Sequence, residues 1–416
     1  MRDFLPADKA RRERVLGVIR AGYRAHGFEE IETPVMEDSA RLHAGLGGDN
    51  EKLAFAVMKR GLTADDLVEA SDPLALADLG LRYDLTVPLA RFYASHRAAL
   101  PAVFRSIQIA PVWRAERPQK GRYRQFVQCD IDIIGEAGPI AEIELITATV
   151  ATLDALGLDG STVRINDRRL LTSTLELLGF PAREHEAVLV TVDKLDKVGP
   201  AGVIAELRDR TFPSGPVDAL EEFLSRAATE ALPFGAEAIR AALPDGADPL
   251  AIAELAAIGD AVIAATGSPV VHFDPWLVRG MGYYTGTIFE IAHPSVSYSL
   301  GGGGRYDGMI GRFLGTDVPA AGFSLGFERI VDLVELPAER QLDAVALVFA
   351  ADVPPALALG LQRDLIALGQ RVRLESQPRN LKPLLAHLAA SGFTAYAVVN
   401  ASSTVGNLDF RALERE

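Results

Sequence analysis

The sequence predicts an α+β protein with a large domain built on an antiparallel sheet, a helical insertion in that domain, and a small C-terminal α/β domain. Three observations lead to this fold class. Strand patterns with one apolar and one polar face surround residues 112–132 and resume at residues 271–329. Between about residues 168 and 265, helical patterns broken by proline and glycine take over. After residue 342, strands alternate with helices, as in a largely parallel sheet.

The chain begins with a helix followed by a strand. Residues 8–26 repeat apolar side chains at four-residue spacing, which predicts an amphipathic helix that ends at Gly27. Residues 28–37 read as a strand, and Pro34 within them indicates a strand edge or end. Residues 43–61 start with glycines and predict a loop.

A polar alternation follows at residues 81–88. It places Arg82, Asp84 and Thr86 on one side of a strand and apolar side chains on the other. We interpret it as a second polar strand beside the central sheet. The alternative is a surface strand that ends at Pro88.

The stretch at residues 126–133 alternates strictly. Phe126, Gln128, Asp130 and Asp132 share one face, and the residues between them are apolar. We therefore expect one sheet face to pack on the core and the other to carry a site. The alternative is a solvated face with ordinary surface charges.

A strongly basic loop precedes this strand. The strand before the loop ends with Arg114 and Glu116, which read as part of the same polar face. The loop repels itself unless it meets phosphate or carboxylate groups. Its polar side chains are Arg117, Gln119, Lys120, Arg122, Tyr123 and Arg124.

The second half returns to the sheet after the helical region. Residues 140–156 predict a helix and residues 162–167 a short strand. Gly301–Gly304 lie within strand-like sequence, where glycines let a ligand approach the backbone, so we expect them to floor a cleft; the alternative is a mobile loop. The sequence contains no G-x-x-x-x-G-K-[ST] motif, so any nucleotide is bound without a P-loop.

The composition is that of a globular protein. The 416 residues are 49% hydrophobic and 24% charged. We find no continuous apolar run of 18 residues and no signal peptide, so we expect no membrane segment and a cytoplasmic location. One cysteine and seven histidines argue against disulfides or structural zinc. Because the net charge is −14, any nucleic-acid contact must come from local basic patches.

Several of these strings resemble one enzyme family. The string VWRAERPQKGRYRQFVQCDID, residues 112–132, resembles motif 2 of class II aminoacyl-tRNA synthetases, in its histidyl-tRNA synthetase version. The string LVRGMGYYTGTIFE, residues 277–290, resembles the histidine-specific signature of that family. The string GFSLGFERI resembles motif 3, whose arginine is Arg329, and residues 8–37 resemble motif 1, which builds the dimer interface of the class.

The resemblance implies a class II synthetase-like fold and a histidine–tRNA ligase. Such an enzyme activates histidine with ATP and Mg²⁺, forms histidyl-adenylate, transfers histidine to tRNA(His), and acts as a homodimer. Arg114 and Arg279 are implied as the catalytic residues, meeting the α-phosphate and the substrate carboxylate. Arginine suits this task because its planar fork grips both kinds of anion and stays charged.

The resemblance also implies the remaining site residues. The histidine site is Asp84, Thr86, Gln128, Asp132 and Tyr284. The ATP site is Arg114, Glu116, Arg122, Phe126 and Arg329. The tRNA acceptor end meets Arg117 and Gln119, and no protein metal ligands are implied. Two positions depart from the common family pattern, since many relatives have glutamate at Asp132 and aspartate at Gly282.

The same resemblance divides the chain. Residues 1–166 and 266–335 are predicted to form the catalytic domain, residues 167–265 the helical insertion, and residues 342–416 an anticodon-binding-like domain that is short at its C-terminus. One alternative is an inert paralogue that senses histidine as a regulatory subunit of histidine biosynthesis. Another is an amide-forming ligase that works without tRNA. The intact arginines and basic loop favour the tRNA ligase.

Overall fold

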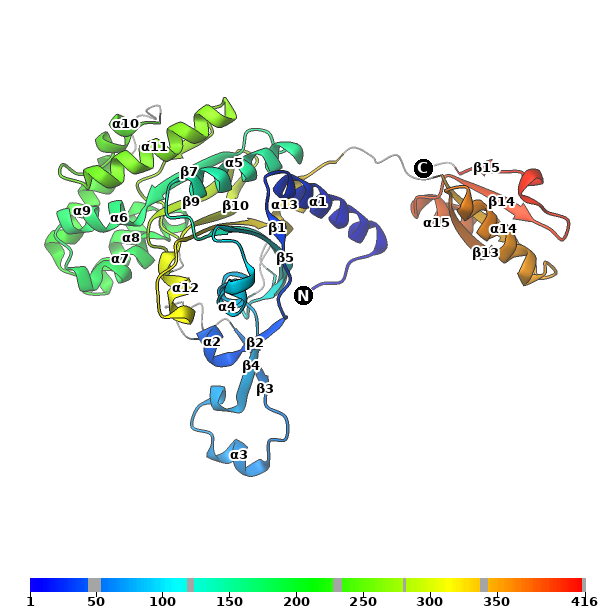
Figure 1. Cartoon of the computed structure of the whole chain (residues 1–416), viewed down its shortest axis with the longest axis horizontal. Helices are drawn as coiled ribbons and strands as arrows, with labels where there is room; N and C mark the ends of the chain where they lie inside the picture. Colours follow the sequence, from blue (N-terminus) through cyan, green and yellow to red (C-terminus); the bar gives the residue numbers. More distant parts are fainter. Residues whose placement is uncertain (44–53, 118–122, 227–233, 280–281, 337–342, 414–416) are drawn as a thin grey trace. The chain divides into compact units, whose positions relative to one another are not determined.

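The computed structural model describes residues 1–43, 54–117, 123–226, 234–279, 282–336 and 343–413 (Figure 1). The chain divides into two compact units. The larger unit holds residues 1–3 and 12–335, and the smaller one holds residues 4–11 and 336–416.

An eight-stranded sheet forms the centre of the larger unit. Its strands in spatial order are β1 (Glu29–Glu30), β5 (Phe104–Trp113), β6 (Gln125–Ile134), β11 (Ala320–Gly326), β10 (Val296–Arg305), β9 (Thr287–His293), β7 (Thr162–Asp167) and β8 (Val271–Phe273). The six inner strands pair antiparallel, and each edge strand pairs parallel with its neighbour. The antiparallel sheet expected from the alternating strands is confirmed.

One face of this sheet is the core. Cys129, Ile131 and Ile133 of β6 are fully buried. The helices α5 (Ile140–Ala155) and α13 (Phe327–Leu333) pack against β6 and β11. Helix α1 (Pro6–Ala25) packs closely on α5, because a Cβ on Gly22 would lie 2.5 Å from the Thr152 hydroxyl. The predicted helices at residues 8–26 and 140–156 are therefore present.

The strand expected at residues 28–37 is interrupted. Only β1 and β2 (Met36–Asp38) are regular, and the residues around Pro34 join them. Proline has no N–H for a sheet ladder, so the chain leaves the large sheet there. Arg82 supports the joining segment, since its buried guanidinium donates to the Thr33 carbonyl at 2.7 Å and to the Pro111 carbonyl at 3.0 Å.

The prediction of a polar strand at residues 81–88 is wrong. β4 (Ala77–Leu81) ends at the first of these residues, and α4 (Thr86–His96) begins at Thr86. The Asp84 carboxylate accepts from the backbone N–H of Val87 at 3.2 Å, as an acidic residue does at a helix start. Pro88 sits in the first turn of α4, where its missing N–H costs nothing.

A small sheet extends from this point. Its order is β2–β4–β3, with β3 at Phe55–Met58, and it carries the short helices α2 (Ser39–His43) and α3 (Ala64–Glu69). Part of the loop expected at residues 43–61 lies outside the described residues. The apolar side chains of Val35, Met36, Met58, Leu67 and Val68 are exposed here.

Helices fill the chain between β7 and β8, as predicted (green in Figure 1). They are α6 (Arg168–Leu177), α7 (His185–Val192), α8 (Leu195–Asp209), α9 (Ser214–Arg226), α10 (Ala236–Ala241) and α11 (Pro249–Thr266). By length and composition α11 is apolar enough to cross a membrane, although Glu254 and Asp260 interrupt its run of apolar residues. Its Ile252, Leu255 and Val262 are buried, however, and it packs on α5, α6 and α10, as a core helix does.

The smaller unit has the predicted alternation of strands and helices. β12 (Ala344–Phe349) pairs parallel with β13 (Arg371–Ser376) and β14 (Ala395–Val399), and α14 (Pro355–Ala367) and α15 (Leu381–Ala390) connect them. The short β15 (Arg411–Ala412) adds an antiparallel edge.

Candidate active site

A cleft of about 750 Å³ opens on the polar face of β6. It gathers residues that lie far apart in the sequence. The predicted site residues that line it are Asp84, Thr86, Arg114, Glu116, Phe126, Gln128, Asp132, Arg279, Tyr284 and Arg329. Arg117 is exposed and does not line the cleft. Gln119 and Arg122 lie outside the described residues.

The floor of the cleft is bare backbone. Gly301, Gly302 and Gly303 of β10 line it, as predicted, whereas Gly304 does not. A Cβ on Gly302 would lie 2.8 Å from the guanidinium of Arg279. A Cβ on Gly322 of β11 would lie 2.0 Å from Oδ1 of Asp132. Glycine is therefore required at these positions, because any side chain would displace the polar groups above them.

Three carboxylates lie at the base of the cleft. Asp84, Asp130 and Asp132 are all buried. Burial raises the pKa of Asp84 to about 6 and that of Asp132 to about 7. Burial, and next the charge of Asp132, raises the pKa of Asp130 well above its usual range. Burial therefore makes these carboxyl groups harder to ionise than exposed ones, and a bound cation would favour their ionised forms.

Two of these groups are held by neighbours. The hydroxyl of Tyr306 donates to Oδ1 of Asp132 at 2.6 Å. The side-chain amide of Gln128 donates to Asp130 at 3.2 Å and to the Ser324 hydroxyl at 3.0 Å. These bonds fix the direction of the acceptors that face the cleft.

Arg279 is placed by a carboxylate from the neighbouring strand. Its Nη1 donates to Glu290 at 2.6 Å, and Glu290 also pairs with Arg164 at 3.3 Å. Burial lowers the pKa of Arg279, but Tyr284 and Glu290 more than offset it, so the net shift is upward. Arg279 stays a cation in the cleft wall, available to an anion.

The residues expected to bind ATP form the other part of the cleft. Nε of Arg114 donates to the Tyr83 carbonyl at 3.0 Å, and its guanidinium lies 5.1 Å from the ring centroid of Phe126. Arg329 donates to the Ser299 carbonyl at 2.5 Å and lies over the ring of Tyr298. Each of these two cations thus lies beside an aromatic ring, which suits a nucleotide with its phosphates.

Sequence reasoning missed some of the lining. Asp130 showed a signal, since it alternates with Gln128 and Asp132, but it was not assigned a role. Tyr306 directly follows the glycine strand and gave no signal of its own. The end of α7 and the start of α8 also line the cleft, through Val192, Asp193, Leu195, Asp196 and Lys197. The sequence of the helical insertion shows no polar cluster that would predict this, but its packing against the sheet brings Asp193 and Lys197 to the wall.

Comparison with known proteins identifies relatives of this chain. The family model described as histidyl-tRNA synthetase matches residues 1–330. The chain belongs to the histidyl-tRNA synthetase family. A histidine–tRNA ligase of Leifsonia xyli is 59% identical over 423 residues, which cover 99% of this synthetase-family chain and 97% of the relative. A histidine–tRNA ligase of Aeropyrum pernix is 39% identical, covering 80% of this chain and 72% of the relative.

Solved histidyl-tRNA synthetases share the fold. The crystal structure of the enzyme from Nostoc sp. PCC 7120 matches with a TM-score of 0.75 at 23% identity, covering 99% of this chain and 93% of that one. The apo structure from S. aureus matches with a TM-score of 0.64 at 22% identity, with the same coverage. The expected class II synthetase-like fold of this histidyl-tRNA synthetase family member is confirmed.

Proposed function

We propose that the chain is a cytoplasmic histidine–tRNA ligase, which activates histidine with ATP and transfers it to tRNA(His). The 59% identity to a histidine–tRNA ligase over nearly the whole chain supports the ligase rather than the regulatory paralogue. The site residues and their roles are those that the family resemblance implies, and the lining of the cleft supports them.

The observation that carries the site assignment is a set of buried polar atoms without partners among the described residues. They are Oδ2 of Asp84, Oε1 of Gln128 and Nε of Arg279, all from residues that line the cleft. A buried polar atom without a hydrogen bond costs about 1–3 kcal/mol, so a ligand that satisfies it is favoured. Two acceptors and one cationic donor complement the α-ammonium and the carboxylate of an amino acid.

The imidazole of the substrate is assigned to Asp132 and Tyr284. With a pKa near 7, the Asp132 carboxyl can either accept from or donate to a ring nitrogen. The Tyr306 hydroxyl keeps Oδ1 occupied, so Oδ2 is the oxygen offered to the ligand. The buried Tyr284 hydroxyl serves the second ring nitrogen.

Activation then needs positioning and charge stabilisation. Arg114 and Arg279 grip the α-phosphate and the substrate carboxylate, which attacks without a general base because it is already ionised. Phe126 stacks on the adenine, Glu116 accepts from its amino group, and Arg329, together with Arg122, meets the γ-phosphate. These residues place the two anions within reaction distance.

Magnesium fits as a partner of the phosphates. The described residues contain no group of three or more His, Cys, Asp or Glu side chains that could hold a metal ion. Mg²⁺ usually keeps several waters and binds substrate phosphates with one or two carboxylates, so a dedicated protein cage is not needed. When bound, it neutralises phosphate charge as the adenylate forms.

A homodimer accounts for the exposed apolar side chains around the small sheet. Met36, Met58 and Val68 are exposed by 48%, 58% and 84%. Burial of such a patch at an interface removes it from water. Sedimentation at micromolar concentration tests the dimer, and a fully active monomer of 44.6 kDa would contradict it.

The test of the activity is ATP–pyrophosphate exchange with each amino acid in turn. Histidine alone should support exchange, and tRNA(His) should then accept histidine. Exchange with another amino acid, or with none, would overturn the assignment. Exchange with histidine but no charging of tRNA would favour the amide-forming ligase.

A further inference from the structure

We propose that Arg305, which lies outside the substrate cleft, is a positioning residue for histidine recognition, and that it acts by fixing the segments that carry Tyr306 and Tyr284. The inference rests on the proposed function and adds a residue to it.

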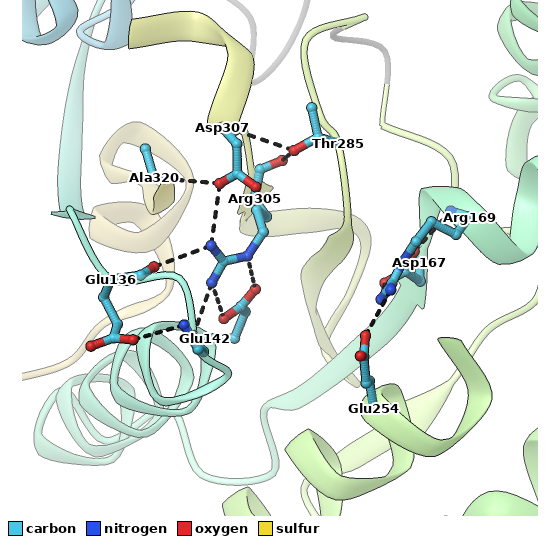
Figure 2. Close-up of polar contacts among 10 residues, drawn as sticks. Glu136, Glu142, Asp167, Arg169, Glu254, Thr285, Arg305, Asp307 and Ala320 are labelled. Atoms are coloured by element: carbon cyan, nitrogen blue, oxygen red, sulfur yellow. Dashed lines mark hydrogen bonds and ion pairs between the residues drawn. The ribbon is translucent and has the colours of Figure 1, made fainter. Parts of the chain in front are cut away.

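Arg305 ends β10 beside a second cavity of about 420 Å³. Figure 2 shows its polar contacts. Its side chain is 11% exposed. All five of its N–H groups donate. The acceptors are both carboxylate oxygens of Glu142 at 2.6 and 2.7 Å, the Gly138 carbonyl at 3.1 Å, and the Glu136 carbonyl and Asp307 at 3.2 Å. The guanidinium is therefore saturated, and it forms a clamp rather than an open binding site.

The clamp joins segments that are distant in the sequence. Glu142 belongs to α5, and the carbonyls of Glu136 and Gly138 belong to the turn after β6. Asp307 starts α12 (Asp307–Leu314) and accepts from the backbone N–H of Ala320, where β11 begins. One side chain thus fixes the ends of β6, β10 and β11 relative to each other.

The backbone on either side of Tyr306 also holds the tyrosine segment. The N–H of Thr285 donates to the Arg305 carbonyl at 2.8 Å, and the N–H of Asp307 donates to the Thr285 hydroxyl at 3.2 Å. Thr285 directly follows Tyr284, so the loop bearing the tyrosine pair is tied to both sides of residue 306. Figure 2 shows Thr285, Arg305 and Asp307 in mutual contact.

The histidine pocket begins one residue away. Tyr306 donates to Asp132 at 2.6 Å, and its ring meets that of Tyr283 edge-on with centroids 6.0 Å apart. Successive side chains point to opposite sides of an extended backbone. The Arg305 side chain therefore points toward Glu142, and the Tyr306 side chain points toward the histidine pocket. A shift of the clamped backbone moves Tyr306 and Tyr284 together, on the side of the ligand where the imidazole is assigned.

Arginine is required for this geometry. Lysine keeps the positive charge, but its three donors cannot reach five acceptors in a plane. Glu142 is buried, so the lost bonds leave carboxylate and carbonyl groups poorly paired, and the backbone must relax to find new partners. A misplacement of about 1 Å at a functional group costs on the order of 100-fold in rate.

The test is Arg305→Lys, assayed by histidine-dependent ATP–pyrophosphate exchange. The KM for histidine should rise at least about tenfold, and the KM for ATP should stay within about twofold. Made in a Tyr306→Phe background, the same substitution should raise the KM for histidine much less, because Arg305 acts on the substrate through Tyr306. A purely structural role would instead give additive effects and raise both KM values.

Arg169 provides the matched control. It lines the same cavity, and its guanidinium pairs with Asp167 at 2.8 Å and Glu254 at 2.7 Å, apart from the Arg305 clamp (Figure 2). Arg169→Lys should leave the KM for histidine unchanged. If Arg305→Lys fails to fold, Asp307→Asn decides the question, since it weakens one arm of the clamp and should raise the KM for histidine selectively.

The outcomes separate the two levels of inference. A wild-type protein without histidine-dependent exchange would remove the proposed function. An active wild type, with Arg305→Lys and Asp307→Asn both keeping the histidine KM within about twofold, would overturn the role of Arg305 alone. An equal rise in the KM for ATP, or an equal effect of Arg169→Lys, would overturn it as well.

Discussion

Gly322 offers a direct test of where the imidazole binds. It pairs with Asp132 across β6 and β11, at the centre of the sheet. A Cβ built on this glycine lies 2.0 Å from Oδ1 and 2.9 Å from Cγ of Asp132, and 3.2 Å from the ring of Tyr306. Gly322→Ala therefore inserts one methyl group between the two residues that define this corner of the pocket.

The size of the effect follows from these distances. Real Cβ atoms essentially never approach another heavy atom within 3.0 Å, so the Asp132 carboxylate must withdraw by about 1 Å. That movement breaks its 2.6 Å bond with Tyr306. Overpacking costs about 1–3 kcal/mol, and a buried polar group without its partner costs about 1–3 kcal/mol. The free energy of unfolding should fall by about 2–6 kcal/mol.

The functional effect should be selective. The KM for histidine should rise on the order of 100-fold, because the group that receives the imidazole is displaced by about 1 Å. The affinity for ATP, measured by equilibrium binding without histidine, should stay unchanged, because Phe126 and Arg114 are remote from the methyl group along the cleft. ATP–pyrophosphate exchange at varied histidine concentration measures the first quantity.

Gly308 serves as the control. It lies in α12 two residues from Tyr306, and a Cβ there meets nothing within 4 Å. Gly308→Ala should leave both affinities unchanged and gain up to about 1 kcal/mol of helix stability. The reasoning fails if Gly322→Ala folds and its histidine KM stays within about threefold of wild type, since Asp132 would then not face the substrate side chain.

Four further predictions follow from the carboxylates and the basic loop. Asp132→Ala should damage histidine-dependent exchange through both KM and kcat while ATP binding persists. The KM for histidine should fall as pH rises from about 5 to 7, because Asp84, with a pKa of about 6, must ionise to hold the α-ammonium; Asp84→Asn should flatten that part of the profile. Asp130→Asn should raise the Tm at pH 8 but not near pH 4. The pKa of the Asp130 carboxyl is higher in the folded protein than in the unfolded chain, so the stability of the wild type falls as the pH rises above the unfolded pKa. Alanine at Arg117 and Gln119 should impair aminoacylation far more than exchange, and equal losses would assign the loop to ATP.

Alternation along one strand predicted part of the cleft lining. The order Phe126, Gln128, Asp130, Asp132 has the two-residue period of a half-buried strand, and the structure places these side chains along one wall of the cleft. The glycines from Gly301 onward predicted a cleft floor without side chains, because glycine in a strand leaves the backbone uncovered whatever the rest of the fold.

Long-range packing explains what could not be predicted. Asp84 and Thr86 were expected on a strand, yet they lie in the cleft from a helix start. The Asp84 carboxylate accepts from the N–H of Val87, and Pro88 suits the first turn of α4. Asp193 comes to the wall only because the helices of the insertion pack against the sheet, and no local pattern encodes that contact. Tyr306 reaches the cleft through its hydrogen bond to Asp132, which lies 174 positions away in the sequence, so no local pattern predicts it.

The shared wall at residues 192–197 has a consequence for the modularity of this protein. An inserted segment that only covers a surface can be deleted to leave a smaller working enzyme. Here Arg164 of β7 pairs with Asp196 of α8 at 3.0 Å and also with Glu290, which holds Arg279. A shortened chain lacking residues 168–265 would lose the part of the cleft lining that Asp193 and Lys197 supply, and Arg164 would keep only Asp274 and Glu290 as its ion-pair partners. The insertion is thus a constituent of the catalytic unit, and attempts to miniaturise the enzyme must retain it.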